Sequence, residues 1–188
     1  MTSHNGIDLD QVTQFTRLLT ADPTAAQTSL RTHHRWDGSY LVTATGDELR
    51  LAGAVLPRSH IVISDRPVAF AGGDRGPVPG ELVLAALAAC ITGQFVEQAA
   101  VRAVALESVD LACEAHLDLR GSLGIGEVQP GLQRVAVLAE VASSAEAQVL
   151  DDLLARAVST SPVAASLSDR VELTCTLQVR EREPMPGR

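Results

Sequence analysis

One stretch of the sequence, residues 79–92, limits more than any other what this chain can fold into. It opens with a proline and is apolar from Leu82 to Ile91, apart from the thiol of Cys90. Proline suits the first position of a helix, and Glu81 then stands at the third, where a carboxylate meets the positive end of the helix dipole. We predict a helix that runs to about Arg102 and is buried on all sides.

A helix without a polar face needs a partner on every side. One sheet covers one side only, so the opposite side needs a second partner. The simplest partner is the same helix of a second copy of the chain. The sequence therefore predicts an obligate homodimer with this helix at its centre.

Charge and composition exclude several classes of protein. The net charge of -8, with arginine as the only basic residue type besides histidine, argues against a nucleic-acid partner. The longest apolar run is about half of what spans a bilayer, and no basic segment followed by an apolar run opens the chain, so neither a membrane partner nor a signal peptide is predicted. Three cysteines without paired spacing favour a reducing cytoplasm over a secreted disulfide framework.

Two further helices are predicted from apolar residues that recur at helical spacing, over about 8–20 and 144–159. A segment rich in glycine and proline, residues 65–79, predicts an irregular loop that leads into the central helix. We expect residues 1–28 to form an N-terminal extension with a short helix, residues 29–180 to form one domain, and residues 181–188 to be a disordered tail.

Strands account for most of the remaining chain. The dipeptides Asp37-Gly38 and Gly46-Asp47 look like hairpin connections, which favours an antiparallel meander in this region. Short apolar segments predict the strands, over 30–36, 40–45, 49–51, 60–63, 108–119, 133–141 and 171–179. The order of elements predicts an α+β fold with antiparallel sheets.

Several motifs, taken in order, resemble the OsmC/Ohr family. They are Asp65-Arg-Pro-Val-Ala-Phe-Ala-Gly-Gly, Gly76-Pro-Val-Pro-Gly-Glu-Leu followed by the apolar run to Cys90, Leu117-Asp-Leu-Arg-Gly, Val128-Gln-Pro-Gly and Ser161-Pro-Val. The resemblance covers roughly residues 29–179. It implies an intertwined homodimer in which antiparallel sheets from both subunits wrap two long central helices.

The resemblance also implies a chemistry. The better understood branches of the family are thiol-dependent peroxidases that reduce organic hydroperoxides at the dimer interface. Their peroxidatic cysteine, which matches Cys90, is helped by an arginine from the N-terminal strands and by a glutamate ten residues before the cysteine. Arg31, Arg35 and Arg50 lie on the predicted N-terminal strands and are the first candidates, of which the resemblance favours Arg35 and Arg31. Arg66 and Arg75, in the loop that leads into the helix, are the alternatives.

The chain departs from this pattern at two positions. The family's resolving cysteine, in a Cys-Pro turn on the second helix, is replaced by Ser161. Gly80 stands ten residues before Cys90, and Glu81 stands nine before. On a regular helix Glu81 lies about 180° around the axis from Cys90, against about 80° for the tenth position, so Glu81 is a poor direct substitute. The Pro-Gly-Glu-Leu form resembles the OsmC-like branches that lack the resolving cysteine.

A peroxidatic thiol must be ionised near neutral pH, which burial among leucine and alanine side chains opposes. The helix dipole cannot compensate, since Cys90 lies roughly 14 Å along the helix from Glu81 and the dipole effect fades within one turn. A nearby arginine must supply the positive charge. The sequence then predicts a one-cysteine cycle, in which a sulfenic acid forms at Cys90 and an external thiol reduces it.

A second interpretation stays open, in which Cys90 is inert core filler. The protein would then be a non-enzymatic dimer whose apolar crevice binds a small hydrophobic or electrophilic ligand. Cys113 and Cys175 fall in predicted strands and are expected to be structural. No cofactor is predicted, and no metal either, because the adjacent His33 and His34 point to opposite faces of a strand.

Overall fold

The computed structural model describes residues 3–180, which fall into two compact units. One unit spans residues 10–83, and the other combines the residues up to Leu9 with those from Leu84 onward. We call them the N-terminal unit and the C-terminal unit. The tail predicted over 181–188 lies outside the described residues.

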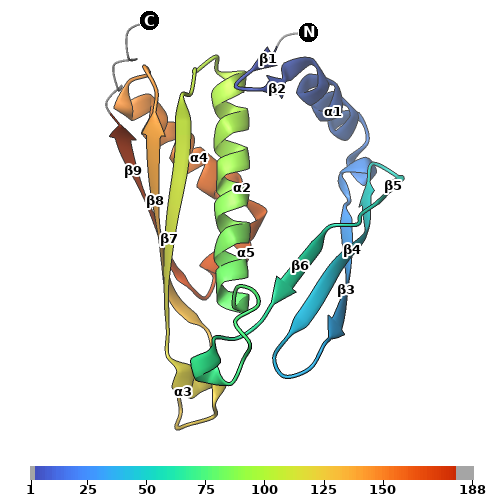
Figure 1. The fold of residues 1–188 in the computed structure, drawn as a ribbon. Coiled ribbons are helices and arrows are strands. Elements are labelled where there is room, and N and C mark those ends of the chain that lie inside the picture. The colour runs from blue at the N-terminus through green and yellow to red at the C-terminus, as the bar shows by residue number, and fades with distance from the viewer. Residues whose placement is uncertain (1–2, 181–188) are drawn as a thin grey trace, which may run out of the picture. The chain divides into compact units, whose positions relative to one another are not determined.

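The C-terminal unit is built on a three-stranded sheet in the order β7 (Ser108–Leu117), β8 (Leu132–Ala142) and β9 (Glu172–Arg180), drawn from yellow to red in Figure 1. β7 and β8 pair antiparallel, whereas β8 and β9 pair parallel. Helices α4 (Ala147–Thr160) and α5 (Pro162–Ser168) connect the two parallel strands. A parallel pair requires such a crossover, because its second strand must start again at the same end of the sheet.

The predicted α+β class with antiparallel pairing is confirmed, and the β8–β9 pair is the one departure from it. The sequence indicated both the helical segment and the last strand. It did not show that the helices return the chain to the end of the sheet at which β8 starts, so that β9 runs parallel to β8.

The core of the C-terminal unit lies between helices and the inner face of this sheet. Helix α2 (Pro79–Val101) contributes buried side chains at four-residue steps, which places them on one face. Along β8, buried apolar side chains alternate with less buried residues, so the buried ones share the inner face of the sheet. The cluster of buried residues is Leu87, Ile91, Phe95, Ala99, Val135, Val137, Ala139, Val141, Leu150, Leu153, Leu154, Ala157 and Ala164.

Helix α2 begins at Pro79, as predicted, and ends one residue before the predicted Arg102. Its opposite face, with Ala85, Ala89 and Gly93, is exposed in the single chain. Within residues 3–180 it is the one helix that is long and apolar enough, by length and composition alone, to cross a membrane. Core helices of soluble proteins pass the same test, and the buried face of α2 packs as a core helix does.

The N-terminal unit is an open antiparallel sheet of four strands, β3 (Ser29–Trp36), β4 (Val42–Leu51), β5 (Ala54–Pro57) and β6 (Ile61–Ser64). Strand β4 pairs with β3 along one edge and with β5 and β6 in succession along the other. Helix α1 (Leu9–Ala21) precedes the sheet, close to the predicted 8–20, and has no buried residue.

The hairpin predicted at Gly46-Asp47 is wrong, because β4 runs through both residues. The chain turns instead at Ala52 and Gly53, whose φ angles of 49 and 77 degrees are typical of a type I′ turn. Gly46 is needed for a close contact and not for a turn. A Cβ atom at Gly46 would lie 2.9 Å from the Cβ of Arg58, at the point where β4 changes partner from β5 to β6. Glycine here permits a close approach of two chain segments.

A small hairpin of β1 (Ser3–His4) and β2 (Ile7–Asp8) belongs to the C-terminal unit. Asn5 at its turn donates a hydrogen bond to the carbonyl oxygen of Val104 at 2.8 Å and accepts one from the N–H of Leu106 at 3.1 Å. This side chain therefore ties the hairpin to the loop after α2. Three short helical turns complete the described elements: η1 (Pro23–Ala26), η2 (Val68–Phe70) and α3 (Leu119–Ser122).

Candidate functional site

Cys90 is a free, half-buried thiol in the middle of α2. It follows Leu82 and Ala86 at four-residue steps, so the three side chains lie along one stripe of the helix. This stripe borders the exposed face of α2, whereas Leu87 and Ile91 point into the core. The sulfur of Cys90 is therefore positioned at the edge of the core and not inside it.

The other two cysteines lie on the inner face of the C-terminal sheet. Cys113 on β7 and Cys175 on β9 pair with Val137 of β8 from its two sides. Burial raises the pKa of both thiols, and the neighbouring Cys113 raises that of Cys175 further. One strand separates them, so their Cα atoms are about 10 Å apart, too far for a disulfide. These features fit a structural role.

Arg31 and Arg35 lie on β3 in the N-terminal unit, and both are paired with carboxylates. The guanidinium of Arg31 lies 3.6 Å from the carboxylates of Asp47 and Glu48. The Nε of Arg35 donates to Asp37 at 2.6 Å, which raises the pKa of Arg35 and lowers that of Asp37. Support of the thiol on α2 by either arginine stays a prediction.

Glu81 closes the first turn of α2. Its Oε2 accepts a hydrogen bond from the backbone N–H of Val78 at 2.8 Å, as the third residue of a capping box does. Pro79 occupies the first helical position, so both residues of the predicted helix-start signal, Pro79 and Glu81, are observed. The carboxylate of Glu81 is thus used to cap the helix.

The position of the family's resolving cysteine is occupied by a buried hydroxyl. Ser161 is fully buried between α4 and α5, and its Oγ accepts a hydrogen bond from the N–H of Ala164 at 3.2 Å. It therefore caps α5, with Pro162 at the first helical position. The hydroxyl group of Ser161 therefore stabilises the turn between α4 and α5.

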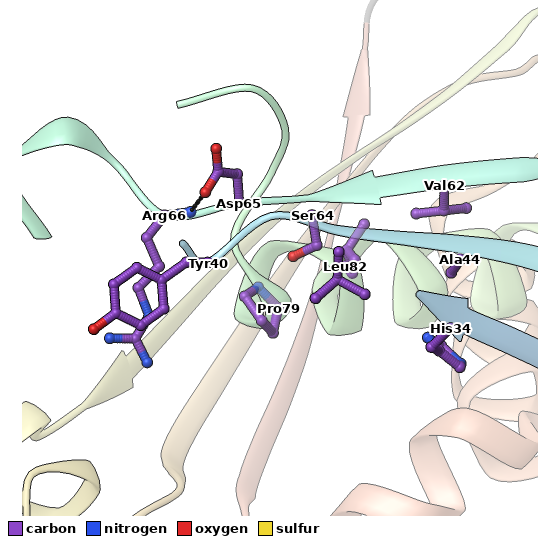
Figure 2. A pocket seen from close by; sticks show the side chains of 10 residues that line it. His34, Tyr40, Ala44, Val62, Ser64, Asp65, Arg66, Pro79 and Leu82 are labelled. Carbon is purple, nitrogen blue, oxygen red and sulfur yellow. Dashed lines mark hydrogen bonds between the residues drawn. The ribbon is translucent and has the colours of Figure 1, made fainter. Parts of the chain in front are cut away.

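A cavity of about 360 Å³ lies within the N-terminal unit, between one face of its sheet and the first turn of α2 (Figure 2). Figure 2 shows Arg66 and Tyr40 at one end of the cavity and His34 at the other. The guanidinium carbon of Arg66 lies 4.1 Å from the centre of the Tyr40 ring. The lining residues are His34, Tyr40, Val42, Ala44, Val62, Ser64, Asp65, Arg66, Pro79 and Leu82.

Asp65 fixes the loop between β6 and α2. It is 2% exposed, and its carboxylate accepts hydrogen bonds from the backbone N–H groups of Arg66 at 2.8 Å, Gly73 at 3.1 Å and Arg75 at 3.3 Å. Burial acts to raise the pKa of Asp65, but these bonds and the charge of Arg75 outweigh it and hold the pKa below its usual range. The loop therefore folds around an ionised carboxylate.

The sequence placed Asp65 and Arg66 in a family motif, but it predicted neither the hydrogen bonds of Asp65 nor the contact of Arg66 with Tyr40. The available signal was an acidic residue shortly before a pair of glycines. Gly72 is required because a Cβ atom there would collide with the carbonyl oxygen of Arg66. Such a tight loop presents several N–H groups to one acceptor.

No metal centre is found within residues 3–180, where no three His, Cys, Asp or Glu side chains come together. The two adjacent histidines have separate partners. His33 lies 3.3 Å from the carboxylate of Asp47, and the Nε2 of His34 lies 3.0 Å from the hydroxyl of Thr32.

The two units define an α+β protein organised on a long apolar helix that carries a single accessible thiol. The chain belongs to the OsmC family, because the family model described as OsmC-like protein matches residues 72–176, more than half of its length. This match includes Cys90 and the whole of α2, and it begins within the loop that Asp65 fixes.

Solved structures share the fold at low sequence identity. An OsmC-like protein from Mycoplasma pneumoniae superimposes with a TM-score of 0.63 at 13% identity, over 82% of this chain and 98% of that one. Organic hydroperoxide resistance proteins from Legionella pneumophila (TM-score 0.57, 18% identity, 80% and 97% covered) and Bacillus subtilis (0.53, 19%, 80% and 98%) are also similar. No curated protein matches the chain. The OsmC-like fold predicted from the sequence is therefore confirmed.

Proposed function

We propose that this protein is a soluble, cytoplasmic homodimer that defends against oxidative stress by reducing organic hydroperoxides through Cys90. Membership of the OsmC family supports this, as do the names of two similarly folded proteins. The observation that carries the proposal is the position of Cys90, a free thiol at the edge of the core in the segment that matches the family. Cys113 and Cys175 lie instead on strands of the C-terminal sheet and pack against the core.

The proposed reaction needs only the one cysteine. The thiolate of Cys90 attacks an oxygen of the hydroperoxide, the O–O bond breaks, and the alkoxide takes a proton and leaves as an alcohol. The sulfur becomes a sulfenic acid. A first external thiol displaces water to form a mixed disulfide, and a second releases the Cys90 thiol and carries away the oxidised donor. An external donor is needed because Ser161 occupies the resolving position.

Assays of peroxide consumption test this proposal. We expect the purified protein to consume cumene hydroperoxide in the presence of a monothiol or dithiol donor, and Cys90→Ser to abolish the activity. The matched variants Cys113→Ser and Cys175→Ser should keep most of it. Dimedone should label Cys90 after peroxide treatment. If no donor supports turnover and Cys90 resists alkylation in the folded protein, the proposal is wrong.

The activating arginine is proposed from the family pattern to be Arg35, with Arg31 as second candidate. Because both are paired with carboxylates of the same unit, a change of partner would have to accompany activation. Arg35→Gln and Arg31→Gln should each be compared with Arg50→Gln for the rate at which Cys90 is alkylated. A slower rate only in the Arg50 variant would contradict this assignment.

The proposed dimer accounts for the exposed apolar surface. The face of α2 with Ala85, Ala89 and Gly93 is uncovered in the single chain, and a second copy of α2 would bury it. Ala89→Glu should therefore give a monomer in sedimentation velocity, whereas Ala155→Glu on the exposed side of α4 should leave a dimer. A wild-type protein that sediments as a monomer would contradict this part of the proposal.

The cavity of the N-terminal unit favours a second candidate function. In this alternative the protein binds a small hydrophobic ligand without catalysis, and Cys90 is core filler. It predicts that Cys90→Ser retains ligand binding and that no sulfenic acid is trapped. The peroxide assay separates the two candidates.

A further inference from the structure

Arg66 is the one arginine among the residues that line the cavity, and no side chain within residues 3–180 neutralises its charge. No carboxylate of residues 3–180 lies within 4 Å of its guanidinium, which also donates no hydrogen bond to a described residue. Arg31 and Arg35 in the same unit are instead paired with carboxylates. Arg66 is therefore available to an anion from outside the chain.

The neighbouring carboxylate does not serve as its partner. Both oxygens of Asp65 accept hydrogen bonds from backbone N–H groups. Figure 2 shows the Asp65 carboxylate turned away from the guanidinium of Arg66. Asp65 thus positions the backbone of Arg66 without neutralising its side chain.

Tyr40 holds this guanidinium in place. Its ring lies under the guanidinium carbon at 4.1 Å, within the range of a cation–π contact. Stacking occupies the flat face of the guanidinium and leaves its N–H groups at the edge free. Those groups match the two oxygens of a carboxylate.

The rest of the cavity is suited to an apolar chain. Val42, Ala44, Val62 and Leu82 line it, and the nearby polar side chains of His34 and Ser64 already have protein partners. A volume of about 360 Å³ is at the small end of ligand-binding cavities. The protein as a whole carries a net charge of -8, so attraction of an anion has to be local.

We propose that this cavity binds a medium-chain monocarboxylate, with its carboxylate on the guanidinium of Arg66 and its chain over Val42, Ala44 and Val62. The inference deepens the second candidate function, because it names the ligand class. It does not use the thiol of Cys90, so it is independent of the proposed peroxide chemistry.

Calorimetric titration of the full-length protein with octanoate, 1-octanol and octylammonium tests the proposal. The three probes share one chain and differ in the head group. We expect octanoate to bind at least about tenfold more tightly than octanol, the effect of one charge-assisted hydrogen-bonded contact, and octylammonium to bind most weakly. Equal binding of octanoate and octanol would contradict the role of Arg66 and leave a general hydrophobic site. Preference for octylammonium would overturn the proposal.

Variants locate the site. Arg66→Gln should weaken octanoate binding about tenfold or more and leave octanol binding unchanged, whereas Arg58→Gln, an exposed arginine of the same unit, should affect neither. Val62→Trp should fill the cavity and reduce binding of both probes, with a thermal melt to show that it folds. Cys90→Ser should bind octanoate as the wild type does. Unchanged octanoate binding in Arg66→Gln, or its loss in Cys90→Ser, would place the site elsewhere and overturn the proposal.

Discussion

The two units of this chain differ in where their apolar side chains go. The C-terminal unit buries Phe95, Leu87 and Ile91 of α2 against a sheet and two helices. In the N-terminal unit, Leu41 is the one buried apolar residue among those described, while Trp36 and Ile61 are 72% and 65% exposed. One unit therefore supplies its own core, and the other does not.

This difference indicates which part of the chain depends on something outside it. An open antiparallel sheet can leave one face to water, but large apolar side chains gathered on it mark a surface that contacts a partner or ligand. The C-terminal unit has the usual source of stability, which is apolar burial. The N-terminal unit has strand pairing and a loop folded around one carboxylate.

Phe95→Ala should give the largest effect. Phe95 is 1% exposed within the core cluster, so its truncation should lower the free energy of unfolding by about 3–5 kcal/mol. Phe70→Ala, at a phenylalanine of the N-terminal unit that is 53% exposed, is the matched control and should cost less than about 0.5 kcal/mol. Urea denaturation measures both, and similar losses would remove the contrast between the units.

Asp65→Asn should destabilise the N-terminal unit in a pH-dependent way. The pKa of Asp65 is lowered in the folded chain, so its stabilising contribution is present above about pH 4 and is lost as the pH falls through the lowered value. The variant should melt several degrees below wild type at neutral pH, and the gap should close on acidification. Asp74→Asn in the same loop is the control, and a gap that does not change with pH would contradict this account.

Ser161→Ala should give a smaller loss in the C-terminal unit. The variant removes the acceptor for the N–H of Ala164 at a buried helix start, which typically costs about 1 kcal/mol. Ser168→Ala, whose exposed hydroxyl bonds the carbonyl oxygen of Ala165, should be nearly neutral. Equal losses in urea denaturation would argue against a capping role.

Glu81→Ala should have the smallest effect on stability. Loss of an exposed cap and of a carboxylate at the helix start typically costs about 0.3–1 kcal/mol, and Glu81→Gln should cost less because an amide oxygen still accepts from Val78. If Glu81 only caps the helix, both variants should keep the rate of peroxide reduction. A large loss of that rate with an unchanged melting temperature would instead assign Glu81 to the chemistry.

The features that could be predicted from the sequence are those with local causes. Pro79 and Glu81 are start signals that act within one turn, so the beginning of α2 was predicted to the residue. The hairpin at Asp37-Gly38 was likewise predicted, and Gly38 has a φ of 101 degrees. Gly46-Asp47 carries a similar signal, but there the glycine meets Arg58 from a segment further along the chain. A local pattern cannot separate these two uses of glycine.

The same distinction between local and long-range causes applies to the candidate site. Cys90 could be placed because a family motif surrounds it within one helix. The hydrogen bonds of Asp65 to Gly73 and Arg75 and the stacking of Arg66 on Tyr40 could not, since they join residues that are not neighbours in the sequence. The parallel direction of β9 was missed for this reason too, because it depends on how α4 and α5 cross the sheet.

The border between the two units falls inside α2, between Val83 and Leu84. A gene cut at this border would leave one product ending in a single helical turn, and the other starting without Pro79 and Glu81. A lone turn in water is unstable, because helix nucleation costs more than one turn returns. We therefore expect the two halves to fold poorly when they are expressed separately. For the same reason, recombination between related genes should rarely separate them.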